Sequence, residues 1–130
     1  MVSRCRISRC VAEIVQRAAA DAAPHEACGL LFGSVDVIES VQVVENHAEN
    51  PETHFEIDPR ALFAALKAER AGGPKLAGYF HSHPGGDATP SATDAAMAAL
   101  DGKLWVIVAG EAMTAWRAGA AGFEPVELIA

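Results

Sequence analysis

The chain has 130 residues, 51% hydrophobic and 21% charged, so it is long and apolar enough to bury one hydrophobic core. Its 10 lysines and arginines stand against 17 aspartates and glutamates, and a net charge of -7 argues against a nonspecific electrostatic grip on nucleic acid or anionic membranes. Three cysteines without a C-x-x-C pair argue against a disulfide-stapled secreted fold, and no apolar stretch approaches the roughly 20 residues of a spanning helix. We therefore predict one cytoplasmic domain, residues 1–130, that binds neither nucleic acid nor membrane.

The first predicted elements are an amphipathic helix and a β-hairpin. From Val11 onward, six apolar residues recur at helical spacing, with Ser8 available as the N-cap and Pro24 just beyond the end. A mostly apolar segment, 27–32, then precedes a Gly-Ser turn and a segment of alternating valines, 35–43. We expect these two segments to pair as antiparallel strands.

The rest of the chain predicts a loop, two more helices and four more strands. Residues 45–57 lack clean periodicity, and Asp58 followed by proline caps a helix that ends at a Gly-Gly-Pro run. The Ala-rich segment 91–100 predicts the last helix. The remaining strands are predicted at 76–83, 104–109, 112–117 and 123–129. The sum is a mixed α/β fold with about three helices.

A metal site is predicted at the end of the strand expected at 76–83. On a strand, residues i and i+2 point to the same face, so His81 and His83 present two imidazoles side by side. The flexible Gly-Gly turn that follows allows the carboxylate of Asp94 to fold back toward them. Two nitrogens and one oxygen suit Zn²⁺ with a fourth position left open, which is typical of catalytic zinc.

Each part of this pattern also has an ordinary structural explanation. The two histidines fit plain strand residues, and Ser91 with Asp94 three positions later fits a capping box that serves only a helix start. Their occurrence together between positions 81 and 94 favours the metal site.

The run HSHPGGDATPSATD, residues 81–94, resembles the H-[ST]-H-x7-S-x-x-D signature of the JAMM/MPN zinc metalloproteases. The upstream run EACGLL, residues 26–31, resembles the glutamate-bearing strand of the same family. This resemblance implies the family's α/β fold, which is related to that of cytidine deaminases and has a largely antiparallel curved sheet flanked by helices.

The resemblance also implies a role for each matching residue. It makes His81, His83 and Asp94 the zinc ligands. It makes Glu26 the general base and Ser91 a hydroxyl near the developing oxyanion. Amide hydrolysis needs these types of residue, because a carboxylate moves a proton from water to the leaving amine while a donor stabilises the oxyanion.

Five neighbouring residues are assigned no catalytic role. Ser82 points to the opposite strand face, and Cys28, although on the side of the proposed base, is expected to pack in the core as most free cysteines do. His25 is expected to face away from the site. His47 and His54 lie in a loop, where histidines are mostly solvated.

The implied substrate is a ubiquitin-like protein whose C-terminal glycine carries an amide or isopeptide bond. Short connections on both sides of the motif resemble the compact prokaryotic members, and the loop 46–55 resembles members that act on ubiquitin-like sulfur-carrier proteins. The implied partner is therefore such a carrier protein.

Four alternatives compete with this interpretation. A RadC-like protein shares a similar motif, but Ser82 stands where asparagine is expected between its histidines. A non-catalytic MPN scaffold is disfavoured because all ligands and the glutamate are present. A cupin is nearly all strand, and an amidohydrolase barrel needs a chain about twice as long.

Overall fold

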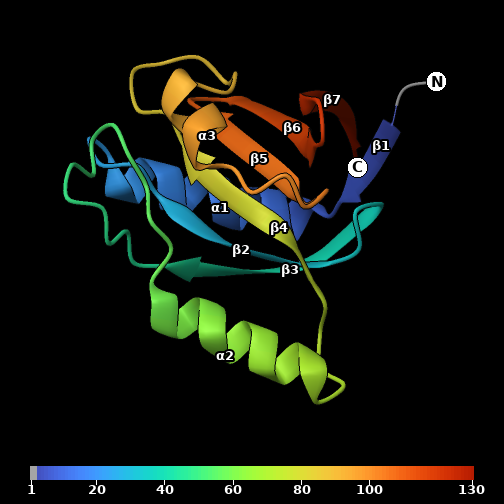
Figure 1. Cartoon of the computed structure of the whole chain (residues 1–130). Coiled ribbons are helices and arrows are strands. Elements are labelled where there is room, and N and C mark those ends of the chain that lie inside the picture. The colour runs from blue at the N-terminus through green and yellow to red at the C-terminus, as the bar shows by residue number, and fades with distance from the viewer. Residues whose placement is uncertain (1–2) are drawn as a thin grey trace.

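The computed structural model describes residues 3–130. In it, seven strands form one curved sheet and three helices pack around that sheet (Figure 1). The elements, in chain order, are β1 (Ser3–Ile7), α1 (Arg9–Ala22), β2 (Cys28–Gly33), β3 (Val37–Val44), α2 (Pro59–Arg70), β4 (Leu76–Ser82), α3 (Ala92–Met97), β5 (Leu104–Ala109), β6 (Ala112–Gly119) and β7 (Gly122–Ile129).

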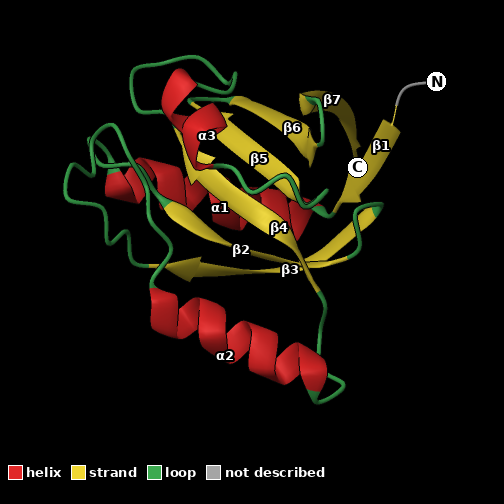
Figure 2. Ribbon diagram, viewed as in Figure 1, coloured by secondary structure: helices red, strands yellow, loops and turns green. Residues whose placement is uncertain are grey.

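The sheet is mixed and mostly antiparallel, which confirms the predicted fold class. Its strand order is β1-β3-β2-β4-β5-β6-β7, and β1 pairs in parallel with both β3 and β7, so the order closes on itself (Figure 2). β4 and β5 are also parallel, whereas the pairs β2–β3, β2–β4, β5–β6 and β6–β7 are antiparallel. The predicted hairpin of β2 and β3 is therefore confirmed.

β4 is an inner strand that separates two packed faces. Phe80 joins the main core, which contains Val11 and Val15 of α1. The next residue, His81, points to the opposite face because side chains alternate along a strand. His81 is also paired with Cys28 of β2 on one side and with β5 on the other, so its backbone is held from both edges.

The helix caps form as the sequence predicts. The Ser8 hydroxyl accepts a hydrogen bond from the Val11 amide at 3.1 Å, and the Asp58 carboxylate accepts one from the Arg60 amide at 2.9 Å. α2 packs against β2 and β4 through Ala65. In Figure 1 α2 lies below β3, and α3 lies at the top of the view.

Some element boundaries differ from the predicted ones. β1 was not predicted, because a five-residue segment of alternating pattern gains its stability from pairing with β3 and β7, which are distant in sequence. α3 ends at Met97 and not at 100, because Ala98 is extended and packs against the cluster of Cys28, Phe55 and Trp105. No helix within residues 3–130 is both long and apolar enough to span a bilayer.

Candidate metal and catalytic site

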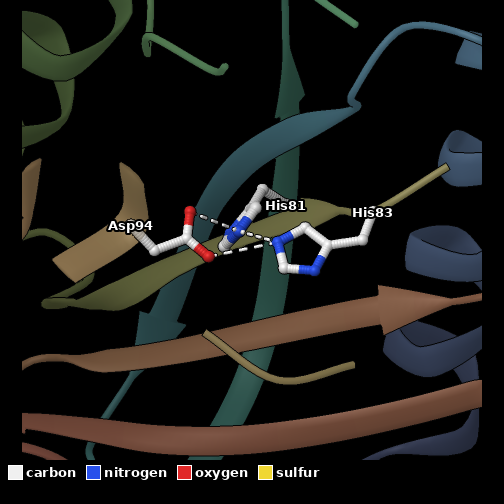
Figure 3. A group of neighbouring side chains, drawn as sticks. All are labelled: His81, His83 and Asp94. Atoms are coloured by element: carbon white, nitrogen blue, oxygen red, sulfur yellow. Dashed lines mark hydrogen bonds and ion pairs between the residues drawn. The ribbon is translucent and has the colours of Figure 1, made fainter. Parts of the chain in front are cut away.

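Three side chains from the segment 81–94 converge at the end of β4 (Figure 3). His81 lies in β4, His83 follows its last residue, and Asp94 lies in the first turn of α3. The two Nε2 atoms are 3.0 Å apart. One oxygen of Asp94 lies 3.1 Å from Nε2 of His81, and its other oxygen lies 3.1 Å from Nε2 of His83. The structure thus brings the three predicted ligands to one point.

The two imidazoles are oriented by different means. Nδ1 of His83 lies 2.7 Å from the carbonyl oxygen of Asp87, so it donates its proton there and leaves Nε2 free to bind a cation. The ring of His81 is instead stacked on Phe55 and touches the edge of Trp105. Among the described residues, nothing makes a hydrogen bond to its buried Nδ1 atom.

Ser91 and Asp94 form a complete capping box at the start of α3. The Ser91 hydroxyl accepts a hydrogen bond from the Asp94 amide at 3.0 Å, and the Ser91 amide donates to Oδ2 of Asp94 at 2.9 Å. The structural explanation of this pair is therefore correct, and it does not compete with the metal site. The box fixes the carboxylate of Asp94 in the direction of both histidines.

Glu26 lies just before β2 and is 6% exposed. Its Oε1 atom is buried and has no hydrogen-bond partner in the part of the chain that the structure describes. Burial raises the pKa of Glu26 to about 7, the positive charge of His83 opposes that shift, and Asp94 adds to it. A carboxylate with such a pKa exchanges protons readily near neutral pH.

The electrostatics of the cluster favour an ionised Asp94. Burial pushes the pKa of Asp94 upward, but hydrogen bonds from His81, His83 and the Ser91 amide outweigh it and hold this pKa below its ordinary value. Burial lowers the pKa of His81, which favours the neutral ring. The hydrogen bond to Asp94 raises the pKa of His83, and burial opposes this rise.

The donor set fits a metal ion. One ligand atom from each of His81, His83 and Asp94 lies within 4.8 Å of the other two, and the three side chains are buried or half-buried. Two nitrogens 3.0 Å apart cannot both donate to each other, and a shared cation satisfies both lone pairs together with the carboxylate. The three residues therefore form a site suited to a metal ion.

The five residues without a predicted catalytic role lie outside this cluster. The Ser82 hydroxyl accepts a hydrogen bond from the Ala27 amide at 2.7 Å, which confirms a structural role. Cys28 is buried in the core, and burial raises the pKa of its thiol to about 12, so it stays protonated at neutral pH. His25 and His47 are exposed, and His54 is half-buried with Nδ1 on the Thr53 hydroxyl.

Two residues that shape the site were not predicted as site residues. Phe55 and Asn46 are the two ends of the loop 46–55, whose resemblance to other family members concerned the substrate and assigned neither residue a role. The aromatic ring of Phe55 in a largely polar loop was a further signal, since a large apolar side chain is usually buried against other residues. A cleft lined by Glu26, Asn46 and Pro51 opens beside this loop, and a second cleft reaches His83.

Comparison with known proteins gives a consistent result. Residues 8–119 match the family described as prokaryotic homologues of the JAB domain. A desampylase from Haloferax volcanii is 36% identical over 86 residues, which cover 65% of this chain and 62% of that protein. A probable TtuB-protein conjugate cleaving protease from Thermus thermophilus is 43% identical over 72 residues, 55% of this chain and 48% of that protein. The match spans less than two thirds of either relative.

The fold is also found in a solved structure. A protein from Desulfitobacterium hafniense, known from its solution structure, superposes with a TM-score of 0.83 at 31% identity. The superposition covers 95% of this chain and 90% of that protein, so nearly every element described above has a counterpart there.

Proposed function

This chain belongs to the family of prokaryotic homologues of the JAB domain, and from that membership we propose that it is a zinc-dependent peptidase. It cleaves an amide or isopeptide bond after the C-terminal glycine of a ubiquitin-like protein. The observation that carries this proposal is the convergence of His81, His83 and Asp94 on one point, with the buried carboxyl group of Glu26 in the same electrostatic environment.

The donor set favours zinc over harder cations. Nε2 of His81, Nε2 of His83 and a carboxylate oxygen of Asp94 would hold the ion, and imidazole nitrogens suit Zn²⁺ better than Mg²⁺ or Ca²⁺. Zinc, when bound, supplies a Lewis acid that polarises the scissile carbonyl and activates water near neutral pH.

The residues of the chain supply the proton transfers and the oxyanion contact. Glu26 takes a proton from the attacking water at its carboxylate and gives it to the leaving amine, a task that suits its pKa of about 7. The hydroxyl oxygen of Ser91 accepts a hydrogen bond from the Asp94 amide. The hydroxyl proton of Ser91 therefore remains available to donate a hydrogen bond to the oxyanion of the tetrahedral intermediate.

A carrier protein is the substrate that we propose. One relative is named as a protease that cleaves TtuB-protein conjugates, which supports a protein conjugate as the substrate of this chain. The net charge of -7 favours a neutral or cationic partner over nucleic acid or an anionic membrane. We place residues 1–130, as one catalytic domain, in the reducing cytoplasm.

The direct test is a cleavage assay on a defined conjugate. The zinc-loaded protein is incubated with a ubiquitin-like carrier that bears one extra amino acid after its terminal glycine, and the products are weighed by mass spectrometry. We expect loss of the added residue, no digestion of casein, and cleavage that is about 10² to 10⁴ times slower in the Glu26→Gln variant. Binding of the carrier without cleavage would favour the non-catalytic scaffold, and cleavage of casein at a similar rate would indicate a broad peptidase.

A further inference from the structure

We propose that Asn46 is a positioning residue that holds Glu26 in place for proton transfer; this rests on the proposed function, in which Glu26 is the general base. Asn46 follows β3 and lies in the irregular loop 45–57. It is half-buried and lines the same cleft as Glu26.

The carboxamide of Asn46 makes four hydrogen bonds, all to the backbone. Its Nδ2 donates to the carbonyl oxygen of Glu26 at 3.0 Å and to that of His54 at 2.9 Å. Its Oδ1 accepts from the amide of Ala48 at 2.9 Å and from that of Glu56 at 3.0 Å. This uses both donors and both lone pairs, the full capacity of an asparagine side chain.

Glu26 depends on these backbone contacts because its carboxyl group has no comparable anchor. Oε1 is buried without a hydrogen-bond partner in the described chain. The backbone at this position is held on three sides. The Glu26 amide donates to the Pro51 carbonyl at 2.7 Å, its carbonyl accepts from Asn46, and the Ala27 amide donates to Ser82 at 2.7 Å. The position of the carboxylate is therefore set by where its backbone is fixed.

Of these three anchors, Ser82 joins Ala27 to the strand that carries His81, and Asn46 joins Glu26 to the loop 45–57. Its bonds to His54 and Glu56 bracket Phe55, the residue whose ring is stacked on His81. The carboxamide of Asn46 therefore joins the segment that carries Glu26 to the segment that carries Phe55. The ring of Phe55 in turn packs on the proposed ligand His81. An aspartate of nearly the same shape keeps both acceptor bonds but cannot donate to Glu26 or His54.

The first test compares variants in steady-state kinetics on the carrier conjugate with zinc loaded. Asn46→Asp and the uncharged Asn46→Ala should both lower kcat by about 10- to 100-fold, the cost of a misplaced catalytic group, while KM stays unchanged. Asn50→Asp is the matched control, since it adds the same charge to an exposed residue of the same loop, and it should keep the parental kcat. A parental kcat in both Asn46 variants would overturn the proposal.

A double-mutant cycle separates action through Glu26 from a general effect on the loop. In the Glu26→Gln background, the base is already lost, so Asn46→Asp should cause no further loss of rate. If Asn46→Asp lowers the rate by the same factor in the parent and in the Glu26→Gln background, Asn46 acts independently of Glu26 and the proposal is overturned.

Amide hydrogen exchange tests the same idea without any activity. The Glu26 amide should exchange about 10-fold faster in Asn46→Asp than in the parent, and Asn50→Asp should leave it unchanged. In the parent protein, the carboxamide protons of Asn46 should exchange more slowly than those of Asn50, a comparison that needs no variant to fold. Equal rates in these comparisons overturn the positioning role. A protein that cleaves no conjugate but shows both differences refutes the proposed function alone.

Discussion

The ring of Phe55 lies almost parallel on the ring of His81, with centroids 4.3 Å apart and planes inclined by 16°. Trp105 meets both rings edge-on, each at a centroid distance of 5.5 Å. Since Nδ1 of His81 has no hydrogen-bond partner among the described residues, the direction of this imidazole depends on aromatic packing.

Phe55→Leu should therefore weaken zinc binding by about 10-fold or more, as the loss of an outer support of a metal ligand typically does. The measurement is competition for zinc against a fluorescent chelator. Phe123→Leu is the matched control, because the ring centroid of Phe123 lies 5.1 Å from that of Trp105 whereas the ring stacked on His81 is that of Phe55, and this variant should bind zinc as the parent does. Equal zinc affinity in the Phe55 and Phe123 variants would show that packing does not orient His81.

The three proposed ligands should each be needed for the metal. The purified protein should hold about one Zn²⁺, and His81→Ala, His83→Ala or Asp94→Ala should lose it, because each removes one of three protein ligands. Elemental analysis by mass spectrometry gives the zinc content. The exposed His25, next to Glu26, supplies the control His25→Ala, which should retain zinc. Full occupancy in the three ligand variants would refute the assignment.

Glu26→Gln should separate metal binding from catalysis. The variant should keep zinc and fold, because Glu26 is not one of the three grouped ligands. It should lose about 10² to 10⁴ in rate, the usual contribution of a general base. Cleavage of the carrier conjugate at the parental rate with zinc bound would make Glu26 a bystander.

The same substitution should change how stability depends on pH in the metal-free protein. Burial raises the pKa of Glu26 from 4.5 to about 7, so its folded state favours the protonated form. Below pH 4.5 the carboxyl group is protonated in both states and costs nothing; as pH rises from 4.5 to 7 the unfolded state gains by ionising, and stability falls.

Glu26→Gln should therefore leave the free energy of unfolding unchanged near pH 4.5. Above pH 7 it should raise the free energy of unfolding of the metal-free protein by up to roughly 3 kcal/mol, which corresponds to this pKa shift. Urea unfolding of chelator-treated protein at both pH values measures the difference. Glu49→Gln, on an exposed side chain, should leave the pH dependence unchanged. A stability gain of equal size at pH 4.5 and pH 8 would contradict a raised pKa.

Ser91→Ala should show two smaller defects. Loss of the N-cap of α3 should reduce the free energy of unfolding by about 1 kcal/mol. Loss of the hydroxyl should also slow cleavage, by less than Glu26→Gln does, through weaker stabilisation of the oxyanion. Ser91→Thr keeps a capping hydroxyl and should recover most of the stability. If Ser91→Ala cleaves the conjugate at the parental rate, Ser91 caps α3 and has no role in catalysis.

The sequence by itself determined the features that depend on near neighbours in the chain. The hairpin of β2 and β3 follows from alternation and a Gly-Ser turn, and the caps at Ser8 and Asp58 follow from local hydrogen bonds. The alternation of His81 and His83 and the capping box at Ser91 are equally local. These parts were predictable because their geometry is fixed within a few residues.

The tertiary structure alone decided what depends on segments that meet across the sheet. β1 exists because two distant strands pair with it, and α3 stops early because Ala98 is drawn into a nonlocal cluster. The raised pKa of Glu26 comes from burial by the whole fold. The loop 45–57 has no periodic pattern, so the stack of Phe55 on His81 and the hold of Asn46 on Glu26 become visible only once the chain has folded. Contacts between residues far apart in sequence leave no local pattern, and here they orient the groups that the local motif supplies.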